Sequence, residues 1–106
     1  MAQNSQTALR RSARVQVRIP VTITGTLTEG QPFKEETYIL TVSKYGARIK
    51  TKARLQKGMQ VTVQPKLRKE SGQFRVVWAG QPGTLREGEA GIEYMKVSNL
   101  LGVSFP

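Results

Sequence analysis

Cysteine, histidine and aspartate are all absent from this sequence of 106 residues. Without cysteine, the chain has no disulfide, no thiolate chemistry and no cysteine-based zinc site. Without histidine and aspartate, a serine triad, an ordinary zinc site and an EF-hand each lose a necessary part. Seven glutamates remain, and none has a recognisable catalytic spacing. We therefore expect a protein that is not an enzyme and holds no metal or cofactor.

Long hydrophobic runs are also missing. No apolar stretch approaches the length that spans a bilayer, and the first nine residues lack the apolar core of a secretory signal. A cytoplasmic location is the default expectation. The length fits one domain with a modest core. We expect residues 1–9 to form a flexible tail and residues 10–106 to form that single domain.

Positive charge is in excess, because the formal net charge is +10. Nine basic residues and no acidic one lie between positions 37 and 69, and Arg10, Arg11, Arg14 and Arg18 lie in a second stretch without acids. Such segments attract anions, so candidate partners carry phosphates, as nucleotides, RNA, DNA and lipid surfaces do. A basic surface that only keeps the protein in solution is the alternative.

Apolar and polar residues alternate strictly from Val15 to Ile23, which predicts a strand with one buried face. Pro20 lies on the polar face of this strand and indicates an edge position or a bulge. Further strands are expected at about 33–42, 47–51, 60–63, 74–78 and 91–95, separated by turn residues, with at most one short helical turn at 97–101. Six short β-segments predict an all-β sandwich or a small barrel, and closure would hide the strand edges.

Side-chain alternation also assigns faces to single residues. Phe74, Val76 and Trp78 share one face of their strand, so we expect Trp78 to fill the core. Lys44 and Arg48 are expected on the solvated surface of a turn and a strand.

Two apolar runs flank Ser43-Lys44-Tyr45-Gly46, which predicts a tight turn between two strands. Ser43 can form local hydrogen bonds, and Gly46 can adopt a positive φ angle without a Cβ clash. The tip of such a turn offers a hydroxyl and bare backbone amides. It is either a plain hairpin or a place where a polar ligand binds, and the stretch alone leaves both open.

The order of these elements resembles the PilZ domain family from Arg10 to about Met95. Arg10 and Arg14 match the family's Arg-x-x-x-Arg motif, with Arg11 as an additional arginine. The next motif, Asp/Asn-x-Ser-x-x-Gly, is matched by Ser43 and Gly46, whereas Thr41 replaces the acidic or amide residue. A tryptophan strand and a closing Gly-Ile-Glu-Tyr segment follow.

The resemblance implies a six-stranded antiparallel β-barrel and binding of the bacterial second messenger cyclic di-GMP. The ligand-binding residues that it implies are Arg10, Arg11, Arg14, Thr41, Ser43 and Gly46. Guanidinium groups suit both phosphates and the O6/N7 edge of guanine. A threonine at position 41 lacks the reach of Asp or Asn toward the guanine N1–H and N2–H₂ donors, and losing such a contact costs about 1–3 kcal/mol, roughly tenfold to a hundredfold in affinity.

Three hypotheses follow. The chain is a cyclic di-GMP receptor module, with binding weakened by Thr41. Alternatively it is a PilZ-like module that contacts a bacterial signalling, motility or pilus protein without nucleotide. The third hypothesis is a small basic barrel that binds RNA or single-stranded DNA. It is the least favoured, because such proteins stack bases on aromatic side chains and only Tyr38 and Tyr45 lie near the basic run.

Overall fold

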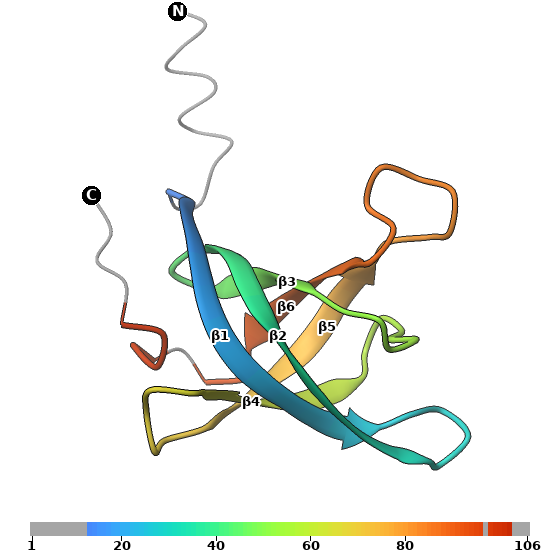
Figure 1. Ribbon diagram of the computed structural model, residues 1–106, viewed down its shortest axis with the longest axis horizontal. Coiled ribbons are helices and arrows are strands. Elements are labelled where there is room, and N and C mark those ends of the chain that lie inside the picture. The colour runs from blue at the N-terminus through green and yellow to red at the C-terminus, as the bar shows by residue number, and fades with distance from the viewer. Residues whose placement is uncertain (1–12, 97, 103–106) are drawn as a thin grey trace, which may run out of the picture.

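The computed structural model describes residues 13–96 and 98–102, and these residues form six strands and no helix (Figure 1). The strands are β1 (Val15–Thr26), β2 (Pro32–Val42), β3 (Gly46–Lys50), β4 (Gln60–Pro65), β5 (Gly72–Ala79) and β6 (Glu89–Tyr94). They close into an antiparallel barrel in the order β1-β2-β3-β6-β5-β4. The predicted six-stranded antiparallel barrel is therefore confirmed.

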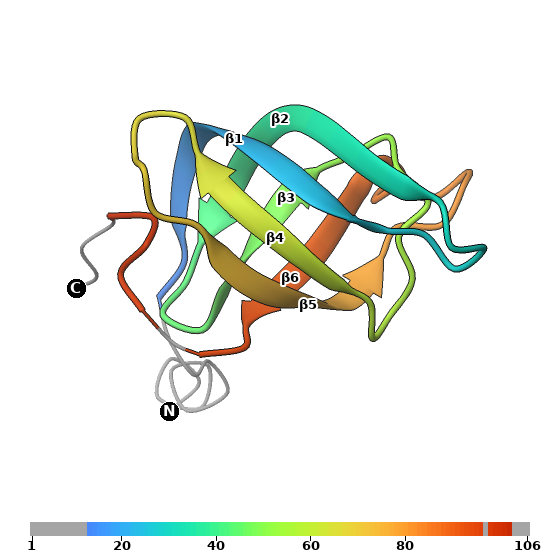
Figure 2. The ribbon, with the colours of Figure 1, turned by 90° about the horizontal axis from the view of Figure 1, so that it is seen from below.

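Strands β1 and β2 form a long twisted hairpin that wraps across one side of the barrel (Figures 1 and 2). The second half of β1 also pairs with β4, from Val21 to Gly25. Pro20 lies just before this ladder and just after a register shift between Gln16 and Ile19. Because proline has no N–H to donate, the boundary of the ladder is a position that tolerates it. Pro20 was expected to indicate an edge position or a bulge, and the adjacent register shift agrees with the second alternative.

The core contains side chains from all six strands. Its largest fully buried members are Phe74, Ile23, Ile39, Ile49, Val21, Val42, Val61, Val63 and Val76. Full burial of each such aliphatic or aromatic side chain contributes about 1.5–3 kcal/mol. The rings of Phe74 and Tyr94 pack with centroids 4.4 Å apart. The alternation seen in the sequence thus corresponds to one face that fills the barrel.

Leu100 and Leu101 are buried against this core from the segment after β6. The segment forms a hydrogen-bonded turn, in which the Gly102 amide donates to the Asn99 carbonyl at 3.1 Å. Residues 98–101 form no helical turn, which agrees with the expectation of at most one, and residue 97 lies outside the described residues. This turn alone brings Leu100 and Leu101 onto the core, without a helix.

Trp78 is not in the core, contrary to expectation. The pairing of β5 with β6 shifts register between Val76 and Trp78, which is a β-bulge. An inserted residue reverses the alternation, so Val76 is 1% exposed whereas Trp78 is 36% exposed on the outer surface.

No helix in the described part of the chain is long and apolar enough to cross a membrane. Within the same residues, no group of three or more histidine, cysteine, aspartate or glutamate side chains could hold a metal ion.

Candidate functional site

The Ser43–Gly46 turn joins β2 to β3 through reciprocal hydrogen bonds. The Ser43 amide donates to the Gly46 carbonyl at 2.8 Å, and the Gly46 amide donates to Ser43 Oγ at 3.2 Å. Gly46 does not use the positive φ angle that glycine allows, because it is not among the positive-φ glycines of the described chain. Glycine is needed there for another reason. A Cβ atom would lie 2.1 Å from the Ile92 carbonyl oxygen and 2.8 Å from the Glu93 Cα atom.

An open groove of about 940 Å³ runs over the outer surface of the barrel beside this turn. Four of the predicted ligand-binding residues line it: Arg14, Thr41, Ser43 and Gly46. Arg10 and Arg11, the other two, lie outside the described residues, as does the predicted tail at 1–9. The groove is within the usual size range of small-molecule sites, about 300–1,000 Å³.

The floor of the groove is a row of residues that face one another across the sheet. Gln16 on β1 pairs with Thr41 on β2, which pairs with Arg48 on β3. Arg48 pairs in turn with Gly91 on β6, and Gly91 pairs with Trp78 on β5. Directly opposed residues in neighbouring strands share one face of a sheet. Thr41 of the second motif and Trp78 therefore lie on the same face of the sheet, connected through the β2–β3, β3–β6 and β6–β5 pairings.

Trp78 covers Gly91. A Cβ atom added at Gly91 would lie 2.0 Å from Trp78 Nε1 and 2.6 Å from Cδ1 and Cε2. The indole therefore lies flat against the β6 backbone, where a side chain would otherwise be. Gly91 is itself buried although it faces outward. The result is a fixed aromatic plane that forms one wall of the groove.

Two arginines that belong to neither motif also line the groove, namely Arg48 and Arg86. Both contact one carboxylate, because Glu89 Oε1 lies 3.5 Å from Arg48 Nη1 and 3.4 Å from Arg86 Nη1. The Arg48 side chain is only 26% exposed, so its expected place on the solvated surface is wrong. The alternation placed it on the outer face correctly, but there it lines the groove with Trp78 and Arg86 and pairs with Glu89.

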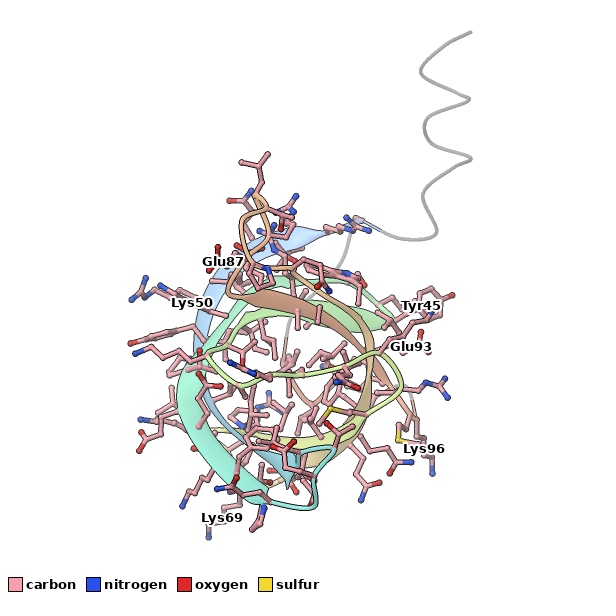
Figure 3. The ribbon with its side chains drawn as sticks, turned by 90° about the vertical axis from the view of Figure 1, so that its right-hand side faces the viewer. Tyr45, Lys50, Lys69, Glu87, Glu93 and Lys96 are labelled. Carbon is pink, nitrogen blue, oxygen red and sulfur yellow. The ribbon has the colours of Figure 1, made fainter. Side chains whose placement is uncertain are left out.

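Arg86 reaches the groove because the loop between β5 and β6, residues 80–88, folds back on itself. The Gly80 amide donates to the Glu89 carbonyl at 2.8 Å, and the Gly83 amide donates to Glu87 Oε1 at 2.8 Å. The loop projects beyond the end of the barrel (Figure 1), and Glu87 is labelled on it in Figure 3. These bonds fix the loop and position its arginine at the rim.

Tyr45 and Glu93 occupy the opposite rim, on the same side of the barrel in Figure 3. Glu93 Oε1 accepts a hydrogen bond from Arg75 Nη2 at 2.9 Å. The ammonium group of Lys44 lies 5.8 Å from the centre of the Tyr45 ring, and Lys44 is exposed as expected.

Tyr94, the residue after Glu93, belongs to the core beneath this rim. Burial raises the pKa of its hydroxyl above the ordinary value, while a hydrogen bond with the Leu101 backbone and the charge of Arg68 oppose that rise. Because its side chain is buried, Tyr94 supports the groove from below and does not line it.

The groove thus combines guanidinium groups from Arg14, Arg48 and Arg86 with an indole plane and the hydroxyls of Thr41 and Ser43. Guanidinium donors bind anions and acceptor edges, and aromatic faces stack on planar rings. The arrangement suits an anionic ligand with flat heterocycles. Sequence reasoning missed Arg48, Trp78, Arg86 and Glu93 as groove residues, since only the strand register and the bulge bring them together.

The sequence profile of the PilZ domain family matches residues 8–100. No curated protein sequence matches the chain. Among solved structures, the inhibitor of motility MotI/DgrA of Bacillus subtilis superposes with a TM-score of 0.62 at 15% identity, over 85% of this chain and 44% of that one. The chain therefore spans less than half of MotI/DgrA.

The PilZ domain of CeSA from a cellulose-synthesizing bacterium superposes with a TM-score of 0.58 at 22% identity, over 85% of this chain and 86% of that one. Both likenesses show a shared fold. The profile match covers most of the 106 residues, and the chain belongs to the PilZ domain family.

Proposed function

We propose that this PilZ domain binds cyclic di-GMP in the groove beside the Ser43–Gly46 turn and acts as a signalling module, not as an enzyme. The observation that carries the proposal is the convergence of both motifs: Arg14 from the first and Thr41, Ser43 and Gly46 from the second line one groove. Such a receptor would act in the cytoplasm, where we place the chain.

The groove offers a partner for each chemical part of the ligand. The two phosphates are served by guanidinium groups at Arg14 and Arg86, and Arg10 and Arg11 precede Arg14 in sequence. A guanine ring stacks on the exposed face of Trp78, whose other face rests on Gly91. Ser43 contributes a hydroxyl that is shared with its own turn.

Titration calorimetry with purified protein and cyclic di-GMP tests the proposal. We expect saturable heat in the wild type and a loss of affinity of roughly tenfold to a hundredfold in Arg14→Met, because hydrogen bonds to charged groups are worth about 1.5–3 kcal/mol. Arg54→Met is the matched control, since Arg54 is exposed and does not line the groove. Equal affinity in the two variants would overturn the assignment of Arg14.

A second candidate is a PilZ module that contacts a bacterial signalling, motility or pilus protein without nucleotide. Thr41 favours it, because the groove floor has a single hydroxyl where an Asp or Asn would accept from guanine. The related fold of an inhibitor of motility suggests the kind of partner. Absence of heat at high micromolar nucleotide in low salt would select this candidate. Competition by a single-stranded oligonucleotide, with a steep salt dependence, would instead select nucleic-acid binding.

A further inference from the structure

Arg48 lies at the centre of the groove floor, between Thr41 on one side and Gly91 on the other. Its Nη1 atom faces Glu89 at 3.5 Å, which is a loose ion pair. Its Nε atom is buried and has no hydrogen-bond acceptor among the residues that the structure describes. A buried donor without a partner is costly. Arg48 is therefore held in place by a carboxylate while part of its hydrogen-bonding capacity is unused.

The geometry of a guanidinium group defines what that capacity suits. The Nε–H and Nη2–H bonds point in parallel and form a fork, which matches two neighbouring acceptors in one plane. Glu89 contacts Nη1, so the fork is not the part that it holds. Thr41, the neighbour across the ladder, contributes a short hydroxyl in place of a carboxylate or amide. At Arg48 itself the floor therefore offers donors, whereas the neighbouring Thr41 hydroxyl both donates and accepts.

Purine edges differ in how they meet a donor fork. Guanine presents two acceptors, O6 and N7, to a bidentate arginine, whereas adenine presents the N7 acceptor beside an N6 amino donor. The edge of guanine that carries N1–H and the 2-amino group consists of donors; Arg48 has no acceptor for it, and the short Thr41 hydroxyl offers one acceptor atom in place of the larger acceptor group of Asp or Asn. A base that lies against Trp78, in the same row as Arg48, brings its edge toward that guanidinium.

Resting on the function proposed above, we propose that Arg48 selects the base by reading the O6/N7 edge of a guanine stacked on Trp78. This contact takes the place of an acceptor at position 41. The site then requires the 6-oxo group of the purine and ignores its 2-amino group. Glu89 acts as a positioning residue, because its carboxylate holds the guanidinium within the row.

The experiment compares three cyclic dinucleotides by titration calorimetry: cyclic di-GMP, cyclic di-IMP, which lacks the 2-amino groups, and cyclic di-AMP. We expect the wild type to bind the first two with similar affinity and cyclic di-AMP about fivefold to a hundredfold more weakly, as one bidentate contact predicts. In Arg48→Lys, which keeps the charge but loses the fork, the ratio of guanine to adenine affinity should fall toward one. Arg54→Lys is the matched control and should keep the ratio.

Each outcome separates this inference from the proposed function. Failure of the wild type to bind cyclic di-GMP overturns both. If Arg48→Lys binds with the same guanine-to-adenine affinity ratio as the wild type, the inference alone is overturned. That result is expected if Arg48 contacts a phosphate, because all three ligands carry the same phosphates. Markedly weaker binding of cyclic di-IMP than of cyclic di-GMP also overturns it, because the 2-amino group is then being read.

A second variant keeps the test decisive if Arg48→Lys does not fold, which circular dichroism would show. Thr41→Asn supplies an amide oxygen next to Arg48. We expect it to create a preference for cyclic di-GMP over cyclic di-IMP that the wild type lacks. If the wild type already has this preference and Thr41→Asn leaves it unchanged, the inference is overturned by that result as well.

Discussion

Replacing Gly91 with alanine should move the indole of Trp78 out of the groove wall. The new methyl group would occupy a position 2.0 Å from Trp78 Nε1, well inside van der Waals contact. The clash involves Nε1, Cδ1 and Cε2 of the rigid five-membered ring, so the indole has to move as a whole. The backbone of β6 is also held on both sides by β3 and β5. The indole must therefore leave.

Two magnitudes follow from that displacement. Stacking of one base on an aromatic side chain is worth about 1–3 kcal/mol, so Gly91→Ala should weaken cyclic di-GMP binding about fivefold to a hundredfold. The free energy of unfolding should fall by about 1–3 kcal/mol, which is the usual cost of overpacking a well-packed position. Titration calorimetry gives the first quantity and urea denaturation the second.

A double-mutant cycle with Trp78→Ala makes the reasoning refutable. Once the indole is gone, the methyl group at position 91 meets no ring, and Gly91 has no positive φ angle to require glycine. In that background, alanine should stabilise the strand by about 0.5–1 kcal/mol, because glycine loses more backbone freedom on folding. The effect on stability therefore changes sign. If Gly91→Ala costs as much without Trp78 as with it, the packing of the indole on Gly91 is not the cause.

Three further predictions concern the turn and the core. Gly46→Ala should destabilise the fold by about 1–3 kcal/mol in urea denaturation, because its Cβ would lie 2.1 Å from the Ile92 carbonyl oxygen and both groups belong to paired strands. Ser43→Ala should cost about 0.5–1.5 kcal/mol, from loss of the 3.2 Å hydrogen bond with the Gly46 amide; an unchanged transition midpoint would refute that role. Tyr94 has a folded-state pKa above its unfolded value, so the unfolded chain ionises first and stability should fall as pH rises above about 10. Tyr94→Phe should remove that part of the loss, and equal alkaline denaturation profiles for the two proteins would contradict it.

The strands were predictable mainly because β1, β3 and most of β5 alternate with the period of two that a half-buried sheet imposes. Val15–Ile23 alternates cleanly, and β1 covers it from Val15 to Thr26. Glycine and proline marked the loops at 27–31 and 80–88 for the same local reason, although Gly25 and Pro32 themselves lie within β1 and β2. The strand pattern left a sandwich and a small barrel open, and the resemblance to the PilZ family favoured the barrel, which also hides the strand edges. These inferences depend on local sequence or on general geometry.

The groove was only half predictable. The two motifs lie at the ends of strands that pair, and Arg14, Thr41 and Ser43 therefore line the same groove. The bulge before Trp78 has no signal in the alternation, so the sequence placed the tryptophan inside. Which residues face Arg48 depends on strand register between segments some forty residues apart.

Gly46 gives the same lesson in another form. The sequence suggested that a glycine at position 46 allows a positive φ angle, whereas the structure needs glycine there because the β6 backbone approaches closely. The first cause is local and the second is tertiary, and the local sequence does not distinguish them.

The central claim is that cyclic di-GMP occupies the groove whose wall is Trp78. The chain has one tryptophan, so a ¹⁵N-labelled sample gives a single indole N–H cross-peak from it in a two-dimensional NMR spectrum. Titration with cyclic di-GMP should shift that peak, together with the amides of Ser43 and Gly46, along one saturable curve. An indole peak that stays in place at saturating nucleotide would contradict the account.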